Sequence, residues 1–395
     1  MAVHALWART SRVLPSRLSA WKHSLMQMEC DVSVIGGGVA GACAALECAK
    51  SGLPVILVEA NREMQWRIGE TLGPESKVAL LSLGLWDEFN QAGHLPSHGN
   101  ASAWGWGGLA EKDFIFNPHG NAWQLDRVAF EEMLTKGAEK AEARIVRGQA
   151  VTEIERSDSG WKIKLVDRLL CSRSIIDATG RRSMVARAQG VKREILDQLV
   201  AVYSVATSMN GKDQDSRTFI ESGPDGWWYT AVMPGGRRTV SFQTDADLLP
   251  GQEWRTREWF LGQLRQTRHV SGILEDHGYE FISPPQLTSA HSGRMERFSG
   301  DGWLAVGDAA MSFDPLSGQG ILKAMQSGMM AAEVVANGTP ESQAGFDRWN
   351  EQLWSQFSKS RNSYYAMEQR WPDSAFWQRR GSRNEREPVA LQARA

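Results

Sequence analysis

Three glycines and one glutamate near the N-terminus have the spacing of a dinucleotide-binding site. The glycines form the pattern Gly36-x-Gly38-x-x-Gly41, and Glu59 follows about 20 positions further on. Gly36 permits a tight turn, Gly38 lets backbone approach a pyrophosphate, and Gly41 lets a helix pack closely on a strand. Free amides and the positive dipole end of that helix favour phosphate, and Glu59 would bind ribose hydroxyls while disfavouring a 2′-phosphate.

The elements around this pattern support the same reading. Residues 31–35 read as a buried strand, residues 39–50 as an Ala-rich helix and residues 55–59 as a second strand. Gly52 and Pro54 would end the helix. The sequence therefore predicts a Rossmann βαβ unit, a context that makes an otherwise weak glycine motif a strong signal.

The rest of the chain alternates between helices and strands. Helices are predicted at 77–90, 127–143 and 320–337, and a hairpin and two further strands at 151–166, 174–177 and 303–306. Alternating apolar and polar residues predict antiparallel sheet from 198 to 245. Because strands typical of the nucleotide-binding unit recur far apart in the chain, we expect an α/β fold whose discontinuous nucleotide domain carries an inserted, mostly antiparallel domain.

Composition fits a protein of two joined domains. The chain has 395 residues, of which 42% are hydrophobic and 23% charged, and its net charge is −2. We therefore expect no nucleic-acid partner, and no apolar run approaches the ~20 residues that span a membrane. The four cysteines lack the spacing of metal ligands or disulfides, so we expect no metal and a reducing, cytoplasmic location. Cys43 and Cys48 read as small packing residues.

These elements give a prediction of domain boundaries. The cofactor-binding domain is assigned to residues 29–76, 120–190 and 290–340, the substrate domain to residues 77–119 and 191–289, and a C-terminal helical segment to residues 341–378. The polar residues 379–395 are expected to be disordered. Residues 1–28 contain basic but no acidic residues, and three readings stay open for them: a start codon assigned too early, a transit peptide, or a surface helix.

Three further motifs connect the chain to a known family. They are Arg67-Ile68-Gly69-Glu70-Thr71-Leu72-Gly73-Pro74, Asp177-Ala178-Thr179-Gly180-Arg181, and Gly307-Asp308-Ala309-Ala310 followed by the segment from Asp314 to Gly320. With the glycine motif, they resemble the flavin monooxygenases of the p-hydroxybenzoate hydroxylase fold, which have flavin-dependent halogenases and geranylgeranyl reductases as cousins. The likeness covers roughly residues 30–335 and implies a glutathione-reductase-like FAD-binding domain with C-terminal helices.

The resemblance also implies which residues hold FAD. Asp308 would bind the ribityl chain, and the turn at Pro315 to Gly320 would bring backbone amides to the pyrimidine end of the flavin. Amides at a helix N-terminus suit the negative charge on N1 of reduced flavin. The expected FAD contacts are Gly36, Gly38, Gly41, Glu59, Arg67, Arg127, Asp177, Gly307, Asp308, Pro315, Gly318 and Gly320.

A narrower likeness comes from five segments in order along the chain. Residues 103–105, 114–120, 125–127, 226–229 and 314–320 together resemble flavoproteins that mature the quinoproteins lysine ε-oxidase, glycine oxidase and quinohemoprotein amine dehydrogenase. This resemblance implies hydroxylation of a precursor tryptophan through a flavin C4a-hydroperoxide, toward cysteine tryptophylquinone. It also implies a quinoprotein precursor as partner.

Three residues are candidates for catalysis, each with a structural alternative. His119 could relay protons or simply support an Asn-Pro-His-Gly turn. Glu70 could sit over the flavin edge or brace its loop by pairing with Arg67. Trp228 could form a flat substrate wall or belong to the core. The same two readings apply to Trp104, Trp106, Trp227 and Tyr229.

Other functions stay open at this point. The Trp-x-Trp-x-Ile-Pro segment of halogenases is replaced by Trp228-Tyr229-Thr230-Ala231-Val232-Met233-Pro234, and neither Lys77 nor Lys112 matches the halogenase lysine, which argues against halogenation. A reductase or dehydrogenase acting on a small aromatic or isoprenoid is a second class, and a flavin-bound maturation chaperone is a third. With only one GxGxxG unit, electrons would come from transiently bound NAD(P)H or a separate flavin reductase.

Overall fold

The βαβ unit forms where the sequence predicts it. In the computed structural model, which describes residues 26–209, 211 and 213–381, β1 (Met26–Ile35) and β2 (Val55–Glu59) run parallel and α1 (Val39–Lys50) joins them. Cys43 and Cys48 on α1 are fully buried, which confirms their packing role. Gly328 lets α8 (Gly320–Asn337) lie against α1, since a Cβ there would collide with the carbonyl oxygen of Ala40.

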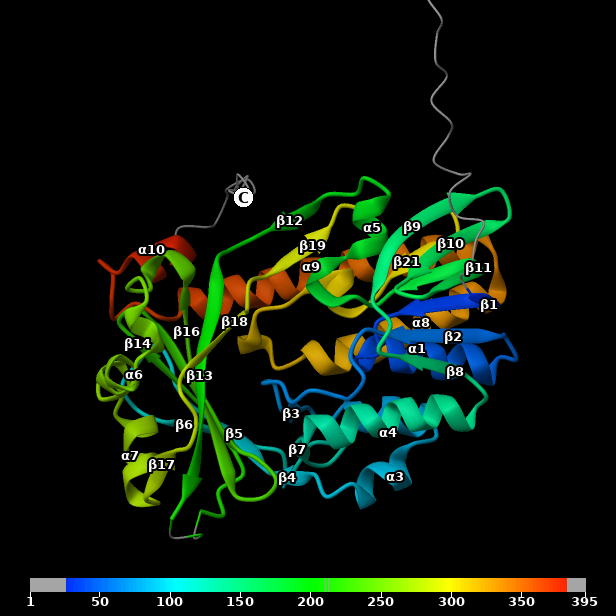
Figure 1. Cartoon of the computed structure of the whole chain (residues 1–395). Helices are drawn as coiled ribbons and strands as arrows, with labels where there is room; N and C mark the ends of the chain where they lie inside the picture. The colour runs from blue at the N-terminus through cyan, green and yellow to red at the C-terminus, as the bar shows by residue number, and fades with distance from the viewer. Residues whose placement is uncertain (1–25, 210, 212, 382–395) are drawn as a thin grey trace, which may run out of the picture.

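The strands of the first sheet come from distant parts of the chain (Figure 1). Its parallel part has the order β21-β11-β1-β2-β8, in which β8 is Arg144–Arg147, β11 is Arg168–Asp177 and β21 is Trp303–Ala305. The antiparallel strands β20 (Ser299–Gly300), β10 (Gly160–Leu165) and β9 (Val151–Ser157) extend it. Ile35 pairs with Asp177 and Asp177 with Ala305, so the three motifs that follow these strands meet at one edge.

Helices complete this lobe, and one prediction needs correction. α4 (Arg127–Lys140), α5 (Met184–Ala188) and α9 (Pro340–Ala366) accompany α1 and α8. The helix expected at 77–90 is two helices, α2 (Ser76–Ser82) and α3 (Trp86–Gln91), because Gly84 between them has a left-handed φ of 70°. Leu80 and Phe89 belong to the core around the first sheet, so this part of the segment assigned to the substrate domain packs on the cofactor side.

The second sheet is mostly antiparallel, as predicted. Its order is β17-β13-β16-β15-β14-β5-β6, with β18 also paired to β13. The bounds are β17 Tyr279–Phe281, β13 Leu199–Ser208, β16 Arg237–Asp245, β15 Gly226–Val232, β14 Thr218–Gly223, β5 Gly99–Ala103, β6 Ala110–Asp113 and β18 Gln286–Ser289. α6 (Arg257–Leu264) and α7 (His269–Asp276) pack on the outer face of this sheet.

Two three-stranded sheets supplement the large ones. One has the order β3-β7-β4, formed by Thr71–Leu72, Ala122–Gln124 and Leu95–Ser97. The other has the order β12-β19-β22, formed by Arg193–Ile195, Gly293–Met295 and Met311–Ser312. Figure 1 shows the labelled strands β3, β7 and β4, and β12 and β19, between the two lobes.

The ends of the described chain differ from two predicted boundaries. β1 begins at Met26, so residues 26–28 belong to a strand rather than to an N-terminal extension. α10 (Ala375–Gly381) includes residues 379–381, which were assigned to a disordered tail. Arg380 is buried and forms an ion pair with Asp245 at 2.6 Å, so this segment packs against the second sheet. The remainder of both predicted tails lies outside the described residues.

Candidate FAD and substrate site

The glycine motif has the geometry that a bound pyrophosphate requires. A Cβ at Gly36 would collide with the carbonyl oxygen of Ala178, and one at Gly41 with the carbonyl oxygen of Gly36, so both positions are closed to side chains. At Gly38 the nearest atom to a Cβ is a guanidinium nitrogen of Arg67, 3.9 Å away. The start of α1 has no side-chain cap, which leaves amides for an anion.

Glu59 is held beside this motif by backbone amides. Its Oε2 accepts a hydrogen bond from the amide of Gly37 at 2.8 Å, and its Oε1 accepts from the amide of Asn61 at 2.8 Å. These bonds fix the carboxylate at the end of β2. Each oxygen keeps a second lone pair, so the group can still accept from ribose hydroxyls.

Asp177 ends β11 and Asp308 follows β21 at the same edge of the sheet, but they differ in exposure. Asp177 is fully buried and accepts hydrogen bonds from Thr179, Val185 and Ala186, so it braces the second motif from inside. Burial raises its pKa against these bonds. The side chain of Asp308 is 43% exposed and pairs with Arg181 at 3.3 Å. Its position fits the ribityl contact expected of it.

Arg193 is a site-supporting residue that the sequence analysis missed. Its guanidinium donates to the hydroxyl of Ser183 at 3.0 Å, to the carbonyl oxygen of Asp308 at 3.0 Å and to the hydroxyl of Ser312 at 2.8 Å. Burial lowers its pKa to about 10. The residue ties the second motif to the third, and nothing in its local sequence context indicates this.

The loop from Arg67 to Pro74 is fixed by charges, though not by the pair considered above. Arg67 forms an ion pair with Glu131 at 3.2 Å, and Arg127 also pairs with Glu131 and donates to the carbonyl oxygen of Gly69 at 2.6 Å. Glu70 is not the partner of Arg67. Arg67 and Arg127 thus lie together near the open side of the glycine motif, where their charges would suit a pyrophosphate.

Glu70 is fully buried between the cofactor loop and the antiparallel sheet. Its Oε1 accepts from the hydroxyl of Thr239 on β16 at 3.0 Å, and its Oε2 accepts from the amide of Gly69 at 3.1 Å. Burial raises the pKa of this carboxyl, with the hydrogen bonds and Arg127 opposing the rise. Glu70 therefore joins the two lobes.

The turn before α8 leaves open space for a ligand. Gly318 has a left-handed φ of 60°, and Cβ atoms at Gly318 and Gly320 would meet nothing within 4 Å. Asp314 fixes the turn by accepting from the amide of Leu316 at 3.0 Å. Arg361 and Tyr365 on α9 bind the other oxygen of Asp314 at 3.2 and 2.8 Å. These two α9 residues lie beyond the recognised motifs, and the sequence analysis missed them.

The aromatic residues that were candidates for a substrate wall separate into different environments. Tyr229 points from β15 toward the cofactor lobe and shares a hydrogen bond of 2.8 Å with Thr71. Trp104 and Trp227 pack together with Tyr365, and the indole of Trp227 donates to the Tyr365 hydroxyl at 3.0 Å. Trp106 is 60% exposed.

Two of the three catalytic candidates, Trp228 and His119, lie in surroundings that favour a structural role. Trp228 is buried on the outer face of the sheet, with its ring centroid 4.9 Å from Phe242 and 5.3 Å from Phe260. Side chains alternate across a strand, so Trp228 faces away from Tyr229 and packs in the core. The backbone amide of His119 donates to the side chain of Asn117 at 2.9 Å, which fits the turn-supporting alternative.

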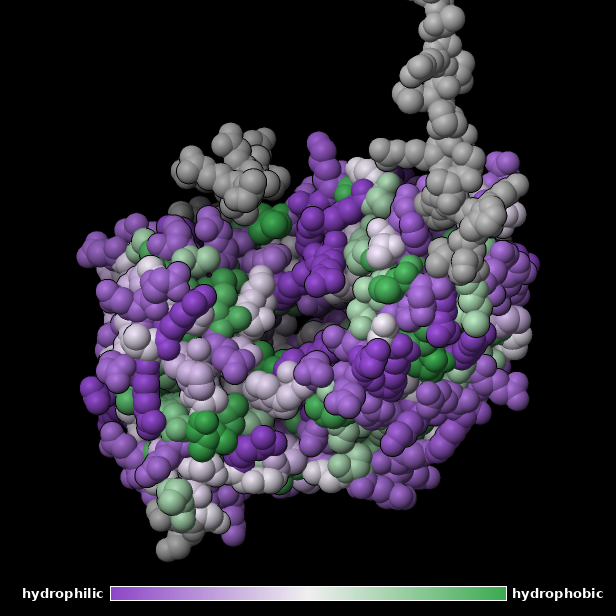
Figure 2. All heavy atoms as spheres, in the orientation of Figure 1, coloured by the Kyte–Doolittle hydropathy of each residue, from purple (hydrophilic) through white to green (hydrophobic). Residues whose placement is uncertain are grey.

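The surface is hollowed between the two lobes (Figure 2). Trp66, which precedes the loop from Arg67 to Pro74, and Tyr203 on β13 bring the two lobes into contact, with their rings 5.9 Å apart. Open space for phosphate and flavin thus lies at the glycine motif, the Glu70 loop and the Gly318 turn. The antiparallel sheet faces these three features. The residues present fit FAD.

The fold and this site define a flavoprotein, and the comparisons with known proteins agree. The family model described as "FAD binding domain" matches residues 29–342, and the chain belongs to this family. It is an FAD-dependent oxidoreductase of the superfamily that contains flavin monooxygenases and halogenases.

The relatives include a putative oxidoreductase and a brominase. The chain is 30% identical over 360 residues to the putative FAD-dependent oxidoreductase LodB of Marinomonas mediterranea, covering 89% of this chain and 96% of LodB. It is 26% identical to the 1H-pyrrole-2-carbonyl-[peptidyl-carrier protein] brominase of Pseudoalteromonas luteoviolacea, covering 77% of each protein.

Solved structures confirm the fold. The myxobacterial halogenase CndH has a TM-score of 0.81 at 23% identity, covering 90% of this chain and 86% of that one. The peptidyl tryptophan dihydroxylase QhpG, described as essential for tryptophylquinone cofactor biogenesis, has a TM-score of 0.75 at 24% identity, covering 93% and 82%. Across the described ranges, no helix is both long and apolar enough to cross a membrane.

Proposed function

We propose that this chain is an FAD-dependent monooxygenase that hydroxylates a tryptophan in a precursor protein during biogenesis of cysteine tryptophylquinone. The observation that carries the proposal is the similarity to LodB along nearly the whole of both chains. The fold shared with QhpG, a peptidyl tryptophan dihydroxylase, points in the same direction. The hollow between the lobes also favours a protein segment over a small molecule enclosed in a tunnel (Figure 2).

The residues of this chain would divide the work as follows. The amides at the start of α1, with Arg67 and Arg127, would hold the pyrophosphate of FAD, and Asp308 would hold its ribityl chain. FAD, when bound and reduced, would supply the chemistry with dioxygen. The turn at Gly318 would place backbone amides where negative charge gathers on the reduced ring.

The substrate side has fewer assigned roles. An indole ring is electron-rich and needs no strong base, so the protein must chiefly orient it and exclude water. Two hydrogen bonds connect the lobes here, one between Thr71 and Tyr229 and one from the Thr239 hydroxyl to Glu70. Glu70 is proposed as the residue that faces the flavin edge.

An intact mass measurement would test this function. Reduced holoprotein and oxygen are incubated with the precursor of a quinoprotein encoded near this chain's own gene, and the precursor is then weighed. We expect a gain of one or two oxygen atoms that peptide mapping assigns to a tryptophan. An unchanged precursor, with flavin that reoxidises normally to peroxide, would contradict the proposal.

Halogenation of a small aromatic is the second candidate, because halogenases are among the relatives and structural neighbours. The positions of the two lysines considered above weaken it. Lys77 lies over the ring of Trp86 at 5.2 Å, and Lys112 lies on the exposed edge strand β6. A halide-dependent mass increase in a small aromatic would favour halogenation.

Two further points concern the electron donor and a chaperone role. NAD(P)H or a separate flavin reductase is proposed as the source of electrons. Oxygen insertion that depends on the substrate would exclude a flavin-bound chaperone.

A further inference from the structure

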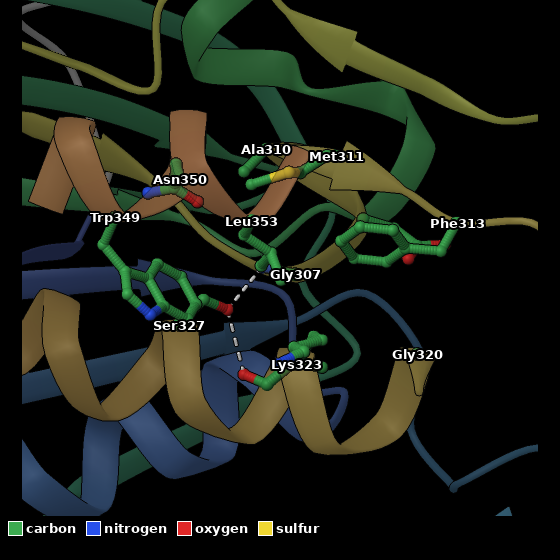
Figure 3. Close-up of a pocket in the computed structure, with 12 residues that line it drawn as sticks. Gly307, Ala310, Met311, Phe313, Gly320, Lys323, Ser327, Trp349, Asn350 and Leu353 are labelled. Carbon is green, nitrogen blue, oxygen red and sulfur yellow. Dashed lines mark hydrogen bonds between the residues drawn. The ribbon is translucent and has the colours of Figure 1, made fainter. Parts of the chain in front are cut away.

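A small pocket lies between α8, α9 and the segment that follows β21 (Figure 3). It has room for about one molecule the size of water. Gly307, Asp308 and Gly320, which belong to the expected FAD site, form part of its lining. The pocket therefore adjoins the place where the flavin is expected.

The walls of the pocket favour a small neutral molecule. They are mostly apolar, with contributions from Met311, Phe313 and Leu353. The Oδ1 atom of Asn350, another lining residue, is buried and has no hydrogen-bond partner. The apolar walls offer few partners to a water.

Lys323 is the unusual residue of this pocket. It stands in the first turns of α8, where the helix dipole disfavours a cation, and burial lowers its pKa. Its Nζ donates to Gln326 at 3.3 Å, and the charge of Glu75 opposes the fall in its pKa. Lys323 thus brings a positively charged residue to the lining of the pocket.

We propose that this pocket admits dioxygen to the reduced flavin and that Lys323 stabilises the negative charge that oxygen acquires there. Bound, reduced FAD would be the reductant and would itself be oxidised, and Lys323 would hold its positive charge next to the oxygen that accepts the electron. The inference rests on the proposed oxygen-using function, but it does not depend on the identity of the substrate.

Two measurements on the holoprotein test the proposal. Crystals pressurised with krypton should show the gas between Met311, Phe313 and Leu353, and the Ala324→Leu variant should lose that site because the added carbons fill the pocket. Water or halide alone at this position would overturn the proposal.

The second measurement is stopped-flow reoxidation without any precursor. In Lys323→Met the reaction with dioxygen should slow about tenfold, as expected for loss of one nearby charge. Lys323→Arg should retain most of the rate, and Lys359→Met, which removes an exposed lysine of α9, should change nothing. Reoxidation by 1,4-benzoquinone, which is too large for the pocket, should be unchanged in all variants.

The remaining results would each contradict either the role of Lys323 or the proposed function. A Lys323→Met rate equal to wild type, or an equal fall with dioxygen and benzoquinone, would overturn the role of Lys323. Normal oxygen kinetics in the wild type with an unmodified precursor would contradict the proposed function and leave this pocket assignment standing.

Discussion

The region that lines the hollow and the packed region behind it use similar residues for different purposes. Gly38, just before α1, faces open space near Arg67, whereas Gly41, in the first turn of α1, has no room for a side chain. Tyr229 reaches the cofactor loop, whereas its neighbour Trp228 lies in the core on the other face of the same strand. Placement by backbone geometry, more than residue type, therefore separates site residues from structural ones.

The sharpest test of this comparison uses the two glycines. Gly41→Ala should destabilise the fold by more than about 4 kcal/mol, because its Cβ would collide with backbone. Gly38→Ala should leave the unfolding midpoint near wild type but weaken FAD binding. Chemical denaturation and flavin titration measure the two effects, and equal loss of stability in both variants would break the comparison.

The two aromatic neighbours should differ in the same way. Trp228→Ala should lower the free energy of unfolding by about 3–5 kcal/mol through a cavity beside Phe242 and Phe260. Tyr229→Phe should cost only about 1 kcal/mol, for one hydrogen bond, and should instead shift the flavin absorbance spectrum. An altered spectrum in Trp228→Ala alone would place Trp228 back at the site.

A buried histidine in the packed region should make stability depend on pH. The pKa of His94 falls from 6.5 to about 4, chiefly through burial. Between these values the unfolded chain binds more protons than the folded one, so stability should rise as pH rises from about 4 to 6.5, by up to about 3 kcal/mol.

Denaturant titrations across that pH range would measure how steeply the free energy of unfolding rises with pH. His94→Asn keeps an acceptor for the amide of Asp126 and should flatten it, whereas His119→Asn serves as the control. If His94→Asn left the pH dependence of the free energy of unfolding unchanged, titratable groups other than His94 would cause it.

The smallest expected effect on stability belongs to the rim of the hollow. Arg67 is half exposed, so Arg67→Ala should barely alter the unfolding midpoint. Loss of its charge beside Gly38 should raise the Kd for FAD about tenfold. Arg168→Ala, at the start of β11 and thus at the opposite end of that strand from Asp177, is the matched control, and an equal affinity in both variants would remove Arg67 from the FAD site.

Much of the cofactor lobe was predictable from sequence because its geometry depends on local motifs. The glycine motif, the hairpin at 151–166 and helix α8 occur where predicted, and pairing of β1, β11 and β21 brings three motifs to one edge. The break at Gly84 was missed because a helical pattern continues across it.

The substrate side was less predictable because long-range packing decides it. Alternation in β15 shows that Trp228 and Tyr229 face opposite ways, but not which face meets the cofactor lobe. Arg193 and Arg361 act through contacts more than 40 residues away in the chain, which no local pattern indicates.

The most direct test of the central claim is the origin of the inserted oxygen. The precursor is incubated with reduced holoprotein under isotopically heavy dioxygen in ordinary water, and the modified tryptophan is then analysed by mass spectrometry. We predict that the heavy isotope appears on the indole ring. Incorporation of ordinary oxygen from water, or an unmodified tryptophan while the flavin turns over, would contradict the monooxygenase account.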